Sequence, residues 1–317
     1  MTVQTSGVTA TEAGLPKERA VTATGHSALP KGQRLDRVYL WMLLPGVVLF
    51  TLFITLPALM GIFFSFTNYA GFGSWKFVGL TNYTAMFDDP RILDSYGFTL
   101  QFAFVTTILA NAVAFALALG LHNKIKFKAP LRTVFFIPMV ISGIVIAYVF
   151  NFLFSTSIPA IATSLGITSL QESILANPSW AWVAIVLVST WQSVPGAMII
   201  YLAGLLAISP EVYEAASIDG ASAWRKFTKV TFPLMIGYVI INTILSFKNY
   251  LNVYDIIVGL TNGGPGTETF SVAMTIFTGF TSGDYAYQMA NAVVFFIVTV
   301  VFSLAQLRLL SGRQVSL

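Results

Sequence analysis

Residues 209–233 read SPEVYEAASIDGASAWRKFTKVTFP and form a polar stretch between two long apolar segments. Ser209 has a side chain that is preferred at a helix N-cap, and Ser222 can cap a second helix. Between them, Gly220 favours a helix end, because glycine readily takes the left-handed conformation found at helix C-termini. The stretch therefore predicts two short helices that are joined by a tight turn and lie at a membrane surface.

A spaced motif lies within this stretch. Glu214-Ala215-Ala216 is followed by three residues and Gly220, and after nine more residues by Val230-Thr231-Phe232-Pro233. The pattern resembles the EAA loop of the permease subunits of binding-protein-dependent ABC importers, with Val230 and Phe232 in place of the family's usual Ile and Leu. The resemblance implies a coupling helix that docks into a groove on a cytoplasmic ATPase subunit. The residues expected at that contact are Glu214, Ala215, Ala216, Asp219 and Gly220. An interfacial amphipathic helix without a docking partner is the alternative.

The composition is that of a membrane protein. Hydrophobic residues make up 56% of the 317 residues and charged residues only 9%, and the mean hydropathy is +0.77. These values lie outside soluble globular usage, so we expect an all-α, polytopic membrane protein. The net charge of +4 could suggest nucleic-acid binding, but the basic residues gather at segment ends, without interleaved aromatics. The chain has no Cys, which excludes disulfides and thiolate metal sites.

Six apolar segments are long enough to span a bilayer. Their approximate limits are 39–66, 100–121, 131–154, 180–208, 232–260 and 287–309. We therefore expect a six-span transmembrane domain of the ABC importer permease type over residues 39–310, with the coupling loop at 209–233. Residues 1–38 are predicted to be a disordered cytoplasmic tail and residues 311–317 a cytoplasmic C-terminal tail. The first apolar segment is too late and too long for a cleavable signal peptide.

Basic residues predict the orientation of the spans. An even number of spans places both termini on one side, and almost all Lys and Arg residues fall on that side as well. Only Lys76 and Arg91 lie opposite, among several carboxylates. By the positive-inside rule, both termini and the EAA loop are cytoplasmic, in a multi-pass protein of the cell (inner or plasma) membrane. The basic residues on the cytoplasmic side are Lys17, Arg19, Lys31, Arg34, Arg37, Lys124, Lys126, Lys128, Arg132, Arg225, Lys226, Lys229, Arg308 and Arg313.

The resemblance to ABC importer permeases covers most of the chain. Residues 130–138 look like the start of the family's third span, and residues 191–205 look like the span that leads into its EAA loop. The Tyr-Asp pair at 254–255 and the Leu-Thr-Asn-Gly-Gly-Pro run at 260–265 are similar to signatures of the carbohydrate-uptake branch. This implies a sugar or oligosaccharide cargo, a second permease subunit, two ATPase subunits and an extracytoplasmic solute-binding protein. Importers for glycerol-phosphate-type or polyol solutes are similar in sequence and are the alternative.

Polar residues make the fifth predicted span unusual. Lys248, Asn252 and Asp255 follow i, i+4, i+7 spacing, which would place all three on one helix face. A charged side chain at the centre of a span costs about 2.5–3.5 kcal/mol on insertion scales, so such residues normally face a partner or a wet cavity. The three residues are therefore candidates for the substrate pathway.

Aromatic and amide side chains extend this candidate site. Tyr250 and Tyr254 form a second i, i+4 pair, and with Asn249 they could bind a polyhydroxylated ligand. For each polar residue in this span, contact with a neighbouring helix is an equal alternative. Weaker candidates of the same kind, which more often bind neighbouring helices, are Asn111, Gln192 and Asn291.

Motifs for catalysis are absent from the sequence. No Gly-rich run ends in Gly-Lys-Ser or Gly-Lys-Thr, so we expect no ATPase site in this chain, with ATP and Mg²⁺ bound by the partner subunits. The two histidines, His26 and His122, lack neighbours that would complete a metal site. We therefore predict no catalytic residue, no metal and no cofactor, in a transport subunit that is not an enzyme. An ATP-independent secondary transporter, which Lys248 and Asp255 could serve, is an alternative from another class.

Overall fold

The computed structural model describes residues 37–123 and 126–311. Over these residues it is all-α, as predicted, and its only strand-like pairing is an isolated bridge between Thr67 and Phe77. The predicted tails at 1–38 and 311–317 fall almost wholly outside the described residues. The chain divides into two units, Met1–Thr55 and Leu56–Leu317. In the first, α1 (Arg37–Phe50) continues into a π-helical turn, Thr51–Thr55.

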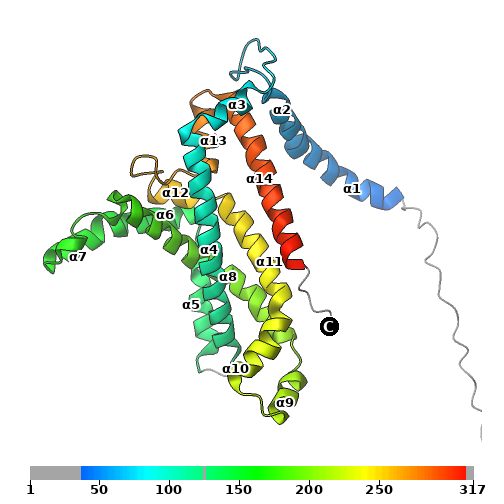
Figure 1. Ribbon diagram of the computed structural model, residues 1–317, viewed down its shortest axis with the longest axis vertical. Helices are drawn as coiled ribbons and strands as arrows, with labels where there is room; N and C mark the ends of the chain where they lie inside the picture. The colour runs from blue at the N-terminus through cyan, green and yellow to red at the C-terminus, as the bar shows by residue number, and fades with distance from the viewer. Residues whose placement is uncertain (1–36, 124–125, 312–317) are drawn as a thin grey trace, which may run out of the picture. The chain divides into compact units, whose positions relative to one another are not determined.

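The second unit contains the remaining α-helices, which Figure 1 labels in chain order. They are α2 (Leu56–Phe64), α3 (Thr81–Phe87), α4 (Pro90–His122), α5 (Lys128–Val140), α6 (Gly143–Phe152), α7 (Ile158–Ser164), α8 (Pro178–Ala207), α9 (Pro210–Ile218), α10 (Ala223–Lys226), α11 (Phe232–Leu251), α12 (Asp255–Leu260), α13 (Val272–Thr281) and α14 (Tyr285–Ser311).

Six helices of the described chain are long and apolar enough to cross a membrane, which confirms the predicted number of spans. Most limits agree with the hydropathy pattern within a few residues, although α4 begins ten residues earlier than expected. The third and fifth spans differ more. The six segments are Trp41–Phe64, Pro90–His122, Gly143–Ser164, Pro178–Ala207, Ala223–Leu251 and Tyr285–Leu309.

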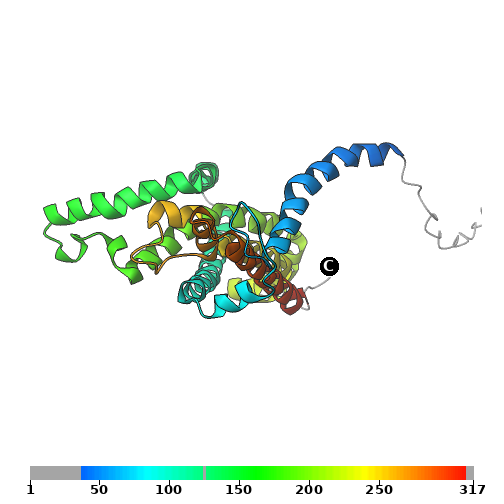
Figure 2. The same cartoon turned by 90° about the horizontal axis from the view of Figure 1, so that it is seen from above.

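The third predicted span, 131–154, is wrong as a single helix. α5 ends at Val140, and Ile141 is extended, with φ −87° and ψ 136°, before α6 begins at Gly143. Pro138, which lacks an N–H group, weakens the last turn of α5. The amide of Gln192 on α8 donates to the freed carbonyl of Ile141 at 3.4 Å. In Figures 1 and 2, α6 leads outward to α7, which lies away from α4 and α11.

The fifth span lies earlier than predicted. α10, a π-helical turn at Phe227–Thr231 and α11 form one uninterrupted helix, Ala223–Leu251, where the hydropathy pattern had predicted 232–260. After Leu251 the backbone leaves the helix, and α12 starts anew at Asp255. The hydroxyl of Ser271 donates to the carbonyl of Val253 at 2.8 Å and so satisfies the broken backbone. The expectation that Lys248, Asn252 and Asp255 share one helix face is therefore wrong.

α4, α8 and α11 form the packed centre of the second unit (Figure 1). Small side chains on one face of α4 allow α8 to approach closely, which is how helices associate where lipid removes the hydrophobic driving force. Tyr201 of α8, 1% exposed, donates its hydroxyl to the side-chain oxygen of Asn111 at 2.7 Å. Asn111 thus joins two helices. The buried alanines of α4 are Ala103, Ala110, Ala114 and Ala118.

α12 packs on α6 through a glycine contact. A Cβ atom added at Gly259 would lie 2.6 Å from Cβ of Ala147 and 3.2 Å from the backbone oxygen of Ile144. One turn further along α6, the amide of Asn151 donates to the carbonyl of Leu260 at 2.6 Å. The two helices that follow the breaks are thereby held against each other.

Replacing Gly259 by alanine should destabilise this contact, because the new methyl group would overlap Ala147. We expect a loss of about 1–3 kcal/mol, measured as a lower midpoint of thermal unfolding of the purified protein. The matched control is Gly237→Ala in α11, where an added Cβ meets nothing within 4 Å. This control should be neutral or stabilising, because alanine is the better helix former. Equal midpoints for the two variants would contradict the packing of α12 on α6.

Candidate functional site

The helix α9 ends as the sequence predicts. Ser209 occupies its N-cap position, although its side chain makes no capping hydrogen bond, and Gly220 follows its C-cap with φ +71°. The N–H of Ala221 bonds to the carbonyl of Ala216 at 3.0 Å, and that of Gly220 to the carbonyl of Ser217 at 3.1 Å. This pair of bonds is a Schellman motif, which requires the left-handed residue that glycine supplies.

Two side-chain bonds tie α9 to the next helix. The hydroxyls of Tyr213 and Thr231 are 3.2 Å apart, and the ammonium of Lys226 donates to the hydroxyl of Ser217 at 2.7 Å. Ser222 caps the following helix by accepting from the N–H of Arg225 at 3.3 Å. The second predicted short helix is therefore the start of the fifth span, since no break separates α10 from α11.

The outer surface of this loop carries the predicted coupling residues. Glu214, Ala215, Asp219 and Gly220 are exposed and Ala216 is half-buried. Two large apolar side chains that the sequence analysis did not select are also exposed, Ile218 at 88% and Trp224 at 72%. Their signal in the sequence was the presence of bulky apolar residues in an otherwise polar loop.

A second candidate site is a cleft where the two helix breaks meet. Its volume is about 580 Å³, and a neighbouring lobe of about 320 Å³ shares Gln192, Asn249 and Tyr250 with it. Gly143 at the start of α6 lies close to residues of α8 and α12. A Cβ atom added at Gly143 would lie 3.3 Å from Nε2 of Gln192 and 3.7 Å from Cβ of Asp255. The main cleft is lined by Met139, Gly143, Ser189, Gln192, Ser193, Asn249, Tyr250, Asn252, Val253, Tyr254, Asp255 and Ile256.

Some polar side chains of this cleft are hydrogen-bonded within the protein and others are free. Ser193 and Tyr250 share a hydrogen bond across α8 and α11. The amide nitrogen of Asn252 donates to the carbonyl of Lys248 at 2.9 Å. The side chains of Asn249 and Asp255 are exposed and bond to no other described residue. The cleft thus offers free amide and carboxylate groups beside an aromatic wall.

Most of the predicted substrate-pathway residues come together in this cleft, although not on the predicted helix face. Lys248 does not: its side chain lines a separate groove of about 480 Å³ with residues of α13 and α14. Asn291 is fully buried and accepts from the hydroxyl of Tyr96 at 3.0 Å, which makes it a contact between α4 and α14. Ser189 and Ser193 were missed, although their i, i+4 spacing on α8 marks a hydroxyl face beside Gln192.

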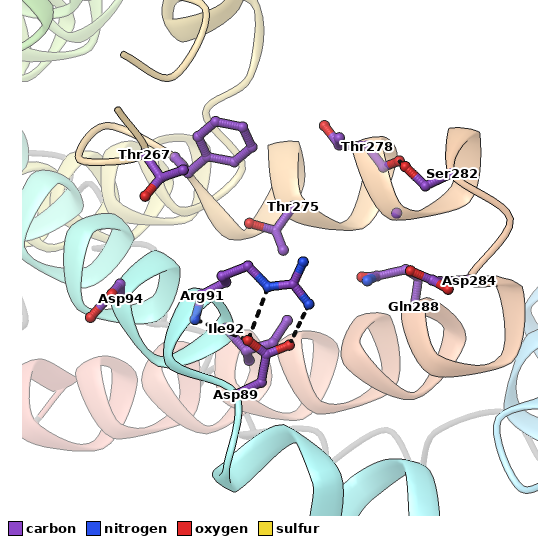
Figure 3. A pocket seen from close by; sticks show the side chains of 12 residues that line it. Asp89, Arg91, Ile92, Asp94, Thr267, Thr275, Thr278, Ser282, Asp284 and Gln288 are labelled. Atoms are coloured by element: carbon purple, nitrogen blue, oxygen red, sulfur yellow. Dashed lines mark hydrogen bonds and ion pairs between the residues drawn. The ribbon is translucent and has the colours of Figure 1, made fainter. Parts of the chain in front are cut away.

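A small pocket of about 120 Å³ is lined by residues from the starts of α4 and α14 and from α13 (Figure 3). In Figure 1, α13 lies at the opposite end of the second unit from α9. Arg91 donates to both carboxylate oxygens of Asp89, at 3.2 and 3.0 Å, and Tyr287 donates to one of them at 3.2 Å. The Arg91 guanidinium holds the pKa of the Asp89 carboxyl below its usual range. Asp94 and Asp284 also line this pocket, which the sequence analysis did not predict.

Comparisons with known proteins agree with this arrangement. Residues 110–313 match the family described as binding-protein-dependent transport system inner membrane component. The chain is 33% identical over 278 residues to the multiple sugar-binding transport system permease protein MsmF of Streptococcus mutans, with 87% of this chain and 96% of the relative covered. It is 32% identical to the trehalose/maltose transport system permease protein MalF of Thermococcus litoralis, with 84% and 91% covered.

A solved structure shares the fold. It is the crystal structure of a bacterial alginate ABC transporter in complex with an alginate pentasaccharide-bound periplasmic protein. One of its chains superposes with a TM-score of 0.75 at 22% sequence identity, over 86% of this chain and 93% of that chain. The family match covers well over half of the sequence, and the relatives are matched over nearly their whole length. The chain is thus a multi-pass membrane protein that belongs to the family of binding-protein-dependent transport system inner membrane components, the permease subunits of ABC importers.

Proposed function

We propose that this permease subunit translocates a sugar or oligosaccharide. The observation that carries the proposal is the cleft between the two helix breaks, where Gln192, Asn249 and Asn252 gather beside Tyr250 and Tyr254. Amide groups supply hydrogen-bond donors and acceptors for hydroxyl groups, and an aromatic wall suits the apolar faces of a sugar ring. Irregular backbone within a membrane protein is tolerated where it lines such a cavity. Relatives whose names refer to sugars support the same cargo.

The α9 loop is proposed as the contact with a cytoplasmic ATPase subunit. Exposed apolar side chains such as Ile218 and Trp224 in a polar loop mark a protein interaction surface. The small side chains of Ala215 and Ala216 let a partner approach the helix backbone, and Glu214 adds a negative charge. In this proposal the complete importer has a second permease subunit, two ATPase subunits that bind ATP and Mg²⁺, and an extracytoplasmic solute-binding protein. In the same proposal, ATP is hydrolysed by the partner subunits alone, and this chain contributes no ATPase site and binds no cofactor.

The distribution of charge supports a cytoplasmic position for α9. Figure 1 shows that α9 and α10 lie at one end of the second unit, and α3 and α13 at the other. The end with α10 carries Arg225, Lys226 and Lys229, whereas the pocket at the other end contains Asp89, Asp94 and Asp284 with Arg91. By the positive-inside rule, the α9 end and both termini would be cytoplasmic, in the cell membrane.

Purification of the tagged chain from its native membrane in mild detergent tests this function. We expect an ATPase and a second polytopic membrane protein to co-purify in stoichiometric amounts. Proteoliposomes of this complex should take up sugar only with ATP and the solute-binding protein. Uptake by the single chain without ATP would contradict the proposal and favour a secondary transporter.

Gly220 allows a sharper test of the coupling loop. Gly220→Val should abolish uptake and uncouple ATP hydrolysis, because a β-branched residue at φ +71° is strained and would distort the end of α9. Membrane insertion should be unchanged. The control is Gly220→Asn, which should retain most uptake, because asparagine tolerates the left-handed conformation. Normal uptake by Gly220→Val, measured with a radiolabelled sugar in proteoliposomes, would refute the role of this loop.

A further inference from the structure

The cleft contains one charged group among the described residues that line it, the carboxylate of Asp255. This side chain is exposed to the cleft, and the ion pair found in the described part of the chain joins Arg91 to Asp89, far from it in the sequence. Asp255 therefore presents a negative charge that no described cation offsets. An acidic solute that enters this side of the cleft would meet a like charge.

The lysine nearest in sequence forms no ion pair with Asp255. Lys248 lines an adjoining groove with Phe295 and Phe296 of α14, and Asn252 lines both that groove and the cleft. Lys248 precedes the break in the backbone, so it does not share a face with Asp255. The cleft consequently lacks the Arg or Lys side chains with which proteins bind carboxylates and phosphates.

Helix N-termini are the other common means of binding an anion, and here they face a protein carboxylate. Asp255 is the first residue of α12, and Gly143, the first residue of α6, adjoins it. Asp255 therefore lies beside both helix starts, although its carboxylate accepts no hydrogen bond from their N–H groups. An anion that approached either helix start would meet this carboxylate.

The free polar groups of the cleft include several acceptors. Gln192 directs its amide nitrogen to the carbonyl of Ile141, and Asn252 directs its amide nitrogen to that of Lys248. Their side-chain oxygens remain available, as do both oxygens of Asp255. These oxygens can accept hydrogen bonds from hydroxyl or ammonium groups, and the free amide of Asn249 can also donate to a hydroxyl.

We infer that the cargo carries no negative charge, being a neutral or amino sugar, and that Asp255 determines this specificity by excluding acidic sugars and sugar phosphates. The inference rests on the proposed function, because it assigns the cleft to the cargo. It also favours sugars over the glycerol-phosphate-type solutes that the sequence alone left open.

Saturation-transfer NMR on the complete importer complex in lipid nanodiscs tests the inference. Direct binding to the complex does not depend on the substrate specificity of the solute-binding protein. The probes are maltotriose, the glucosamine dimer and digalacturonate, which at neutral pH are uncharged, positive and negative. We expect maltotriose and the glucosamine dimer to bind, and digalacturonate to bind at least about tenfold more weakly. This discrimination should decrease as the salt concentration rises.

Two variants identify the responsible group. Asp255→Asn should bring digalacturonate to within about threefold of maltotriose and weaken the glucosamine dimer by about tenfold. The matched control, Asp94→Asn, removes a carboxylate that lies in the pocket at the other end of the second unit and should leave all three affinities unchanged. If digalacturonate binds the unaltered complex as tightly as maltotriose, or if Asp255→Asn leaves their ratio unchanged, the inference alone fails. If none of the three sugars binds, the assignment of the cleft to a carbohydrate fails as well.

Discussion

The hydrogen bond from Ser271 to the carbonyl of Val253 stabilises the break between α11 and α12. In a bilayer, a carbonyl that leaves a helix has no water to bond, and an unsatisfied polar group costs several kcal/mol. Ser271 is fully buried and meets this need at 2.8 Å, while Asn151 does the same for Leu260 at the far end of α12. These bonds allow a break within membrane-embedded protein. The break in turn exposes to the cleft the amide and carboxylate groups that follow α11.

Sequence patterns predicted the number of spans but not their breaks, and the reason is physical. Hydropathy averages over a window of residues, and apolar residues resume at Ile256 and Ile257 after Asn252 and Asp255, so the predicted span continued past Leu251. The carbonyl of Val253, just beyond the end of α11, is bonded by Ser271, eighteen residues later, and the lost bond at Ile141 is replaced by Gln192 on another helix. Contacts between segments that are distant in sequence cannot be derived from a local period. The prediction that Lys248 and Asp255 share one helix face was wrong for this reason.

The candidate sites were predictable to different degrees. A motif with fixed spacing located the α9 loop, and the conformation of Gly220 follows from residue chemistry, since a Schellman motif needs a left-handed residue. Polar residues in an apolar segment located the cleft, because such residues must face a partner or a cavity. The contribution of α8 was harder to predict, since Ser189 and Ser193 are unremarkable in a span until Gln192 is placed between two breaks. Exposure of Ile218 likewise appears only in the folded loop.

The continuity of α10 with α11 connects the two sites mechanically. A helix of 29 residues, Ala223–Leu251, extends over about 44 Å. Its first turns are bonded to α9 through Thr231 and Lys226, and its last turn places Asn249 and Tyr250 in the cleft. A helix transmits displacement because its backbone hydrogen bonds resist bending. The break after Leu251 interrupts these bonds and can bend. A movement of α9 imposed by an ATPase would therefore shift the α11 wall of the cleft relative to α12, which is held on α6 by Gly259 and Asn151. The break is then the place where the cleft can change shape without unpacking either helix.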